Sequence, residues 1–264
     1  MNSPLGHSTI VRLEKAAEDN GFDLRADAEA PWISYTSSRS PLRIWLTALG
    51  EGLFLVAVSQ RNVAETLAGY GYAFSNPLPA GAVGARAAPD IPQLHLLVQR
   101  AFQLSRNLPD ELLHTFQTNI ADLPSTTEAE RQVIQRVGQD LFRESLLEFW
   151  EGRCAITGLA VPALLRSSHI KPWADCETDA ERLDVFNGLL LAPHLDAAFD
   201  RGFITVEDSG AVVVSERLDD AARAVLGLDR PLVVGRLAEG HRRYLGWHRE
   251  RVYQATCEPS SPSS

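Results

Sequence analysis

Cysteine and lysine are both scarce in this chain. Its 264 residues include three cysteines, no two of which form a Cys-x-x-Cys pair, and only two lysines, Lys15 and Lys171. An odd number of widely spaced cysteines argues against a disulfide framework. The missing Cys-x-x-Cys pair excludes a four-cysteine zinc site. Long apolar runs are missing as well, so we expect no segment that spans a membrane.

The remaining composition is that of an ordinary globular protein. Hydrophobic residues make up 45% and charged residues 22%, which is unlike a disordered or fibrous chain. Residues 1–21 lack a basic segment followed by an apolar one, so we expect no secretory signal and a cytoplasmic location. The length allows one large domain or two modest ones.

The charge balance offers little general attraction for nucleic acid. The net charge is −9, and neither half of the chain is basic. Residues 230–251 are an exception, with six arginines against two glutamates, and in 241–251 the arginines, including Arg242 and Arg243, alternate with aromatic residues. That pattern is typical of a helix along a nucleic-acid backbone. An amphipathic C-terminal helix with Tyr244, Leu245 and His248 packed inward is the alternative.

We expect an α+β protein with two domains. An N-terminal mixed α/β domain is predicted over residues 1–122, of unknown recognition or partner role, with a second domain over 123–256 and a disordered tail over 257–264. Hydrophobic periodicity and turn residues predict the elements of the N-terminal domain. They are helices at 8–19, 62–67, 93–104 and 110–116, strands at 32–35, 42–46 and 53–58, a hairpin turn at 50–52 and a loop at 74–92.

The second domain begins with a capping signal. Thr127 and Glu130 have the spacing of a capping box at the start of a helix that runs to residue 150, with an interruption at Gly138. Strands are expected at 203–206 and 212–214, joined as a hairpin, and a final helix at 237–252.

Two carboxylates in this domain are placed to share a cation. Pro193 suits the first turn of a helix, in which Asp196 and Asp200 are four residues apart and lie on one face. Oxygen ligands of this kind favour Mg²⁺ or Mn²⁺. Leu195 and Phe199 form a second pair with the same spacing, which would anchor the helix in the core.

A histidine and an asparagine complete this set. His169 follows an apolar run, where a neutral imidazole at a strand end could accept a proton from water. Asn187 cannot titrate, but it can donate and accept hydrogen bonds and so orient a loop or the histidine. A base, an orienting amide and two carboxylates are typical of a metal-assisted phosphodiester hydrolase.

Three motifs in order resemble the HNH endonuclease family, in the branch found in bacterial restriction-type proteins. The motifs are RCAITG at 153–158, SHIKPW at 168–173 and NGLLLAPHLDAAFDRG at 187–202, and the resemblance covers roughly residues 128–215. It implies a ββα-metal finger in which a strand pair presents the base and a helix presents metal ligands.

The resemblance also implies residue roles. His169 matches the general base, and Asn187 matches the asparagine that organises the loop. Asp196 and Asp200 match metal ligands, and Ser168 stands where a ligating Asp or His is common. We therefore expect a divalent ion, Mg²⁺ or Mn²⁺, bound by few side chains. Cys154 has Thr157 where a second cysteine would be, so no structural zinc is expected.

The function predicted from these motifs is metal-dependent hydrolysis of DNA, with double-stranded DNA as substrate and a restriction or defence role. Arg166 and Lys171 flank His169 and would hold neighbouring phosphates, or else be solvated charges. Because the chain is acidic, we expect a homodimer or an assembly partner to contribute to its affinity for DNA. One alternative is a non-catalytic DNA-binding or scaffold protein with a degenerate finger, which Ser168 favours. Another is a hydrolase of RNA or small phosphodiesters.

Overall fold

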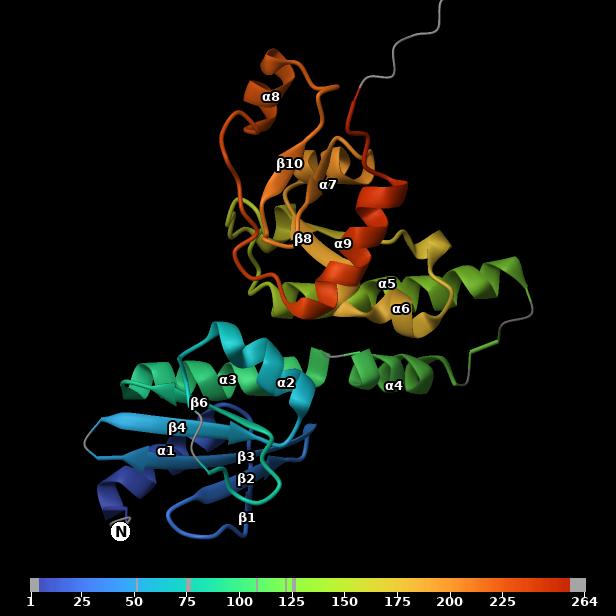
Figure 1. The fold of residues 1–264 in the computed structure, drawn as a ribbon. Coiled ribbons are helices and arrows are strands. Elements are labelled where there is room, and N and C mark those ends of the chain that lie inside the picture. Colours follow the sequence, from blue (N-terminus) through green and yellow to red (C-terminus); the bar gives the residue numbers. More distant parts are fainter. Residues whose placement is uncertain are drawn as a thin grey trace, which may run out of the picture. The chain divides into compact units, whose positions relative to one another are not determined.

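The chain forms two compact units, residues 1–111 and 112–264. The computed structural model describes residues 5–50, 52–74, 77–107, 109–121, 123–124 and 127–256. Both units mix helices and strands, which confirms the α+β class (Figure 1). The predicted boundary after residue 122 falls between helices α4 (Pro109–Ile120) and α5 (Glu128–Phe149). The tail predicted at 257–264 lies outside the described residues.

The first unit is built on a six-stranded antiparallel sheet with the order β1-β2-β3-β4-β6-β5. The strands are β1 (Leu24–Ala26), β2 (Ile33–Ser37), β3 (Ser40–Leu49), β4 (Leu53–Val58), β5 (Tyr72–Ala73) and β6 (Gly84–Ala88). Its helices are α1 (His7–Asp19), α2 (Arg61–Thr66), the short 3₁₀ turn Leu67–Gly69 and α3 (Ile91–Asn107).

Helices α1 and α3 pack against each other and against the central strands of this sheet. Their apolar residues recur at helical spacing, and Leu13, Leu94 and Leu97 are fully buried. The predicted hairpin at residues 50–52 is confirmed by the register of β3 and β4, in which Leu49 lies opposite Leu53. Glu51 in that turn lies outside the described residues.

The prediction of a loop over residues 74–92 is wrong for its second half. Strand β6 lies there and pairs with β4, with Ala88 opposite Phe54. The segment is Gly-Ala-Arg-Ala-Ala, which has none of the β-branched or aromatic residues that mark a strand in a sequence. Pairing to the open edge of β4 decides its conformation, and that pairing is invisible in local composition.

Helix α5 is the main helix of the second unit. The predicted capping box is confirmed, since the Thr127 hydroxyl accepts from the Glu130 amide and the Glu130 carboxylate accepts from the Thr127 amide. The predicted interruption at Gly138 is wrong, because α5 is continuous. A Cβ at Gly138 would lie 2.7 Å from the ring of Trp173. The glycine therefore permits a close packing contact and does not end the helix.

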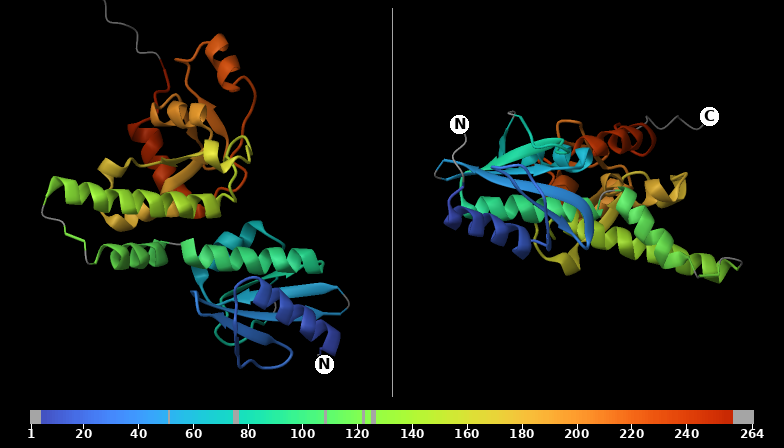
Figure 2. Two further views of the ribbon diagram at one scale, coloured as in Figure 1. Left: turned by 180° about the vertical axis from the view of Figure 1, so that it is seen from behind. Right: turned by 90° about the horizontal axis from the view of Figure 1, so that it is seen from below.

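A strand pair and a short helix lie against α5. Strands β7 (Arg166–His169) and β8 (Gly188–Leu191) are antiparallel, and α7 (Pro193–Asp200) follows β8 directly. Figures 1 and 2 show α5 running along this strand pair. The predicted anchors of α7, Leu195 and Phe199, are buried. This is the ββα arrangement expected from the motifs.

The rest of the second unit surrounds that motif. Its elements are the 3₁₀ turns Pro162–Leu164, Trp173–Asp175 and Val185–Asn187, α6 (Asp179–Leu183), β9 (Ile204–Val206), β10 (Val212–Val214), α8 (Asp220–Leu226) and α9 (Glu239–Arg251). Strands β9 and β10 form the predicted second hairpin. In α9, Tyr244, Leu245 and His248 are buried, so this helix packs inward as the alternative interpretation expected.

Candidate active site

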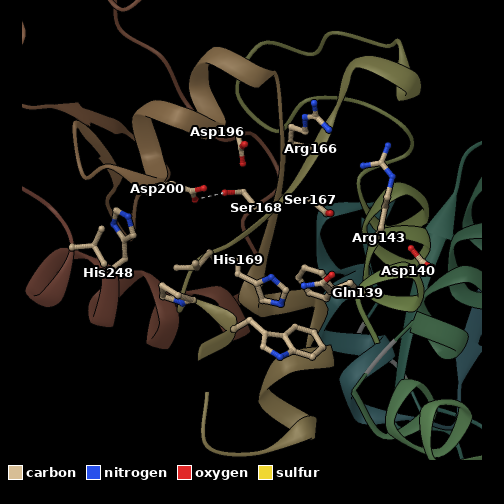
Figure 3. Close-up of a pocket in the computed structure, with 15 residues that line it drawn as sticks. Gln139, Asp140, Arg143, Arg166, Ser167, Ser168, His169, Asp196, Asp200 and His248 are labelled. Carbon is tan, nitrogen blue, oxygen red and sulfur yellow. Dashed lines mark hydrogen bonds between the residues drawn. The ribbon is translucent and has the colours of Figure 1, made fainter. Parts of the chain in front are cut away.

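A cleft of about 750 Å³ lies beside the ββα motif in the second unit (Figure 3). Strand β7 and helix α7 form one part of its wall, and helix α5 forms another. The residues that line the cleft are Gln139, Asp140, Phe142, Arg143, Arg166, Ser167, Ser168, His169, Ile170, Pro172, Trp173, Asp196, Asp200, His248 and Val252. Five of the nine residues predicted for the site are among them.

His169 is the last residue of β7 and lies opposite Gly188 of β8. Its Nε2 atom is 2.9 Å from the backbone oxygen of Arg182. Because a carbonyl oxygen only accepts hydrogen bonds, Nε2 carries the hydrogen and Nδ1 keeps its lone pair. Burial lowers the pKa of His169 below 6.5, against the opposing effect of the Arg182 carbonyl. The ring is therefore neutral at pH 7 and able to accept a proton at Nδ1.

Two aromatic rings hold the imidazole of His169 in place. Phe142 of α5 stacks on it with ring centroids 3.8 Å apart and an interplanar angle of 16°. The Trp173 ring meets it edge-on at 5.5 Å. Glycines make both contacts possible, since a Cβ at Gly188 would lie 2.6 Å from Phe142, and one at Gly138 would lie 2.7 Å from Trp173.

Asn187 is fully buried and does not line the cleft. Its side-chain oxygen accepts from the Lys171 amide at 2.8 Å, and its nitrogen donates to the backbone oxygens of Lys171 and Glu181, both at 3.1 Å. The next carbonyl after Glu181 is that of Arg182, the partner of His169. Asn187 is thus a positioning residue for the segment that orients the histidine.

Asp196 and Asp200 lie on the face of α7 that borders the cleft (Figure 3). Burial is the largest cause that raises the pKa of each, and for Asp200 the neighbouring charge of Asp196 raises it further. The Ser168 hydroxyl opposes this effect and donates to Asp200 Oδ1 at 3.1 Å.

These oxygens fit a hard divalent cation, because two carboxylates that repel each other would both be stabilised by one. The ligand set is small: over the described part of the chain, no three His, Cys, Asp or Glu residues are close enough together to hold a metal ion. The protein could contribute Asp196, Asp200 and the Ser168 hydroxyl, with water completing the coordination.

The four cations predicted to bind nucleic acid are placed differently. Arg166 lines the cleft, and its charge partly offsets the rise in the pKa of Asp196 that burial causes. Lys171 is paired with Glu181 at 3.0 Å, outside the cleft. Arg242 forms an ion pair with Glu239, and Arg243 bonds at 2.5 Å to the buried carboxylate of Asp184. The structure therefore brings only Arg166 to the other site residues.

Helix α7 is fixed at both ends by residues outside its own sequence. At its start, the Cys154 thiol accepts from the amide of Ala192, the N-cap residue, at 3.4 Å. At its end, His248 Nε2 donates to the Phe199 backbone oxygen at 3.1 Å, and His248 Nδ1 accepts from Thr205 at 3.0 Å. Cys154 is a buried free thiol, and it also helps to position the carboxylate helix.

Residues 154–207 match the family model of the HNH endonucleases. The second unit contains an HNH endonuclease domain. The match includes β7, β8, α7 and β9, and it confirms the resemblance drawn from the three motifs. No curated protein matches the chain. An HNH domain indicates nuclease activity on DNA. Over the described residues, every helix is too short or too polar to cross a membrane.

Several residues of the cleft are not predicted as site residues by the sequence motifs. Phe142, Arg143 and Trp173 stand out, because the first and third hold His169 and the second brings a cation to the cleft. Phe142 and Arg143 precede the matched residues, and only the helical periodicity of α5 would have placed them on a common side with Gln139.

Proposed function

We propose that the HNH domain hydrolyses DNA phosphodiester bonds with the help of a divalent metal ion. The observation that carries this proposal is that a neutral histidine and two carboxylates line the same cleft. His169 has a free Nδ1 lone pair, and Asp196 and Asp200 offer hard oxygen ligands on the same cleft. The family match to an endonuclease supports the same chemistry.

In the proposed reaction, His169 Nδ1 accepts a proton from a water molecule as its oxygen attacks phosphorus. The bond from phosphorus to the leaving oxygen then breaks, and that oxygen takes a proton from solvent. The Arg182 carbonyl stabilises the imidazolium that forms, because it accepts from Nε2 in both protonation states. Mg²⁺ or Mn²⁺, held by Asp196 and Asp200 with Ser168 beside them, would supply positive charge for the phosphate and the leaving oxygen.

A non-catalytic DNA-binding or scaffold role is the second candidate. Its support is Ser168, whose hydroxyl is a poorer metal ligand than a carboxylate or an imidazole and is bonded to Asp200. A scaffold, however, needs neither an oriented histidine nor two repelling carboxylates. The retention of both favours catalysis.

The wider setting is part of this proposal. We infer a double-stranded DNA substrate, a cytoplasmic location and a role in restriction or defence, in keeping with the motifs. The net charge of −9 opposes general attraction to DNA, so affinity would come from a few arginines, or from a homodimer or assembly partner. The first unit, which lies outside the family match, would supply recognition of the target or of a partner.

The test is cleavage of supercoiled plasmid by the full chain, with Mg²⁺, Mn²⁺ or EDTA. Nicking or linearisation with either metal, and none with EDTA, is the expected result. Single-stranded DNA and RNA, assayed in parallel, would show cleavage faster than that of plasmid if the substrate class is wrong. Intact plasmid with both metals, from modified and unmodified sources, would favour the non-catalytic candidate.

A further inference from the structure

Arg143 brings a positive charge to the cleft, and it forms no ion pair with Asp140, which lies one turn earlier on the same helix and also lines the cleft. Arg143 lies on α5 and lines the cleft together with Arg166. Over the described residues, no Asp or Glu oxygen lies within ion-pair distance of either guanidinium. Other arginines of this unit are paired, for example Arg243 with Asp184 and Arg249 with Asp208.

Backbone carbonyls hold the Arg143 guanidinium. One terminal nitrogen donates to the Leu165 oxygen at 2.9 Å, and the other to the Pro162 oxygen at 3.3 Å. These carbonyls belong to the segment that leads into β7, so the position of Arg143 is tied to the strand that carries His169. Neutral carbonyls fix a guanidinium without cancelling its charge. An arginine has five N–H donors, so three remain for a ligand.

The two arginines and the two carboxylates follow one another along the cleft. Figure 3 shows Arg166 between Arg143 and Asp196, with Asp200 further along the same direction. A bound metal would make the Asp196–Asp200 end attractive to one phosphate, and the two arginines would then attract a second, neighbouring phosphate of the same strand.

We propose that Arg143, with Arg166 beside it, binds a DNA phosphate next to the one that is cleaved. This inference rests on the proposed function, because it assigns the direction in which the strand lies across the site. A guanidinium fork suits two phosphate oxygens at once, and its fixed position reduces the entropy lost on binding. Arg143 acts on binding and alignment of the strand, and His169 remains the base.

A purely structural Arg143 would also make the two carbonyl contacts, so the test must separate the two roles. The parent is the full chain with His169→Ala, which we expect to slow cleavage strongly. The variants add Arg143→Gln, which can still donate to a carbonyl but has no charge. The matched control adds Arg131→Gln, on the same helix but outside the cleft, where Arg131 is paired with Glu128. The probe is a short fluorescein-labelled DNA duplex, titrated at several salt concentrations.

The expected result for Arg143→Gln is an affinity about tenfold lower. The slope of log affinity against log salt concentration should also become shallower by about one, as for loss of one phosphate contact. Arg131→Gln should match the parent in both. Unchanged affinity and salt dependence in Arg143→Gln, even with a lower Tm, would overturn the proposal, and so would a parent that does not bind the duplex at low salt. The two proposals can fail separately. If Arg143→Gln weakens binding as expected but the wild type leaves plasmid intact in the cleavage assay, the nuclease activity is overturned and this binding site stands.

Discussion

The ring of Phe142 lies flat on the ring of His169, with centroids 3.8 Å apart and an interplanar angle of 16°. Phe142 comes from α5 and His169 from the end of β7, so this contact joins the long helix to the strand that carries the base. The Phe142 ring also covers the imidazole, and burial lowers the pKa of His169. The same ring therefore orients the imidazole and keeps it neutral.

Replacing Phe142 by leucine should change how cleavage depends on pH. Removing the stacked ring admits water, so the pKa of His169 should rise towards its usual 6.5, and more of the base is protonated below pH 7. The acidic limb of the single-turnover rate should move to higher pH. Phe149→Leu is the control, because Phe149 is equally buried but contacts Trp150, Phe186 and His241. Identical pH profiles for the two variants would contradict this role of Phe142.

Gly188→Ala should destabilise the domain and reduce activity together. The new Cβ would lie 2.6 Å from Phe142 and 2.7 Å from Leu146, and both side chains are buried. Overpacking of this kind costs about 1–3 kcal/mol, measured as the free energy of unfolding in urea. Gly235→Ala is the control, since nothing lies within 4 Å of its Cβ. Equal stability of the two variants would show that the packing around Phe142 is looser than described.

Asp200→Asn should raise Tm at neutral pH while abolishing metal-dependent cleavage. The pKa of Asp200 in the folded state is raised above 3.8. Protonated Asp200 therefore stabilises the fold fully below pH 3.8, and this stabilisation is lost as the pH rises through the pKa of the folded state. At pH 7 the ionised carboxylate repels Asp196, and the amide removes that repulsion. The gain should be modest, about 1 °C, because Asp200 is only partly desolvated in the cleft and the solvent that still reaches it screens the repulsion.

The same variant tests the metal site by a second readout. Mg²⁺ or Mn²⁺ should raise the Tm of the wild type and raise that of Asp200→Asn much less. Asp208→Asn serves as the control, because Asp208 is paired with Arg249 outside the cleft. A metal-induced rise that is equal in all three proteins would place the ion elsewhere.

His241 should make the protein sensitive to acid. It is fully buried, Nε2 has no hydrogen-bond partner over the described residues, and burial lowers its pKa to about 4. A lowered histidine pKa contributes stability above pH 6.5 that is lost as pH falls through about 4. Between pH 6.5 and 5 this loss is on the order of 2 kcal/mol.

His241→Phe should remove most of that loss, because phenylalanine has no proton to bind and suits the surrounding rings of Phe149, Trp150 and Phe186. The measurement is the unfolding free energy of both proteins at the two pH values. An equally large loss in the variant would assign the acid sensitivity to other groups, such as His248, whose pKa is also lowered to about 4.

The part of the site that could be predicted is the part encoded by local spacing. The interval from Asp196 to Asp200 places two carboxylates on one helix face in any α-helix, and the capping box at Thr127 marks a helix start. Arg143 and Phe142 could not be assigned in this way, because they reach the cleft through the packing of α5 on β7. The predicted interruption at Gly138 and the predicted loop at residues 84–88 are wrong for the same reason, since a contact distant in sequence decides each.

The most direct test of the central claim is the single-turnover rate of plasmid cleavage with Mg²⁺ or Mn²⁺ for wild type, His169→Ala and His194→Ala. His194 is the matched control, an exposed histidine on α7 that does not line the cleft. We predict a loss of about 100-fold or more in His169→Ala, the usual contribution of a general base, and an unchanged rate in His194→Ala. Cleavage at the wild-type rate by His169→Ala would contradict the account.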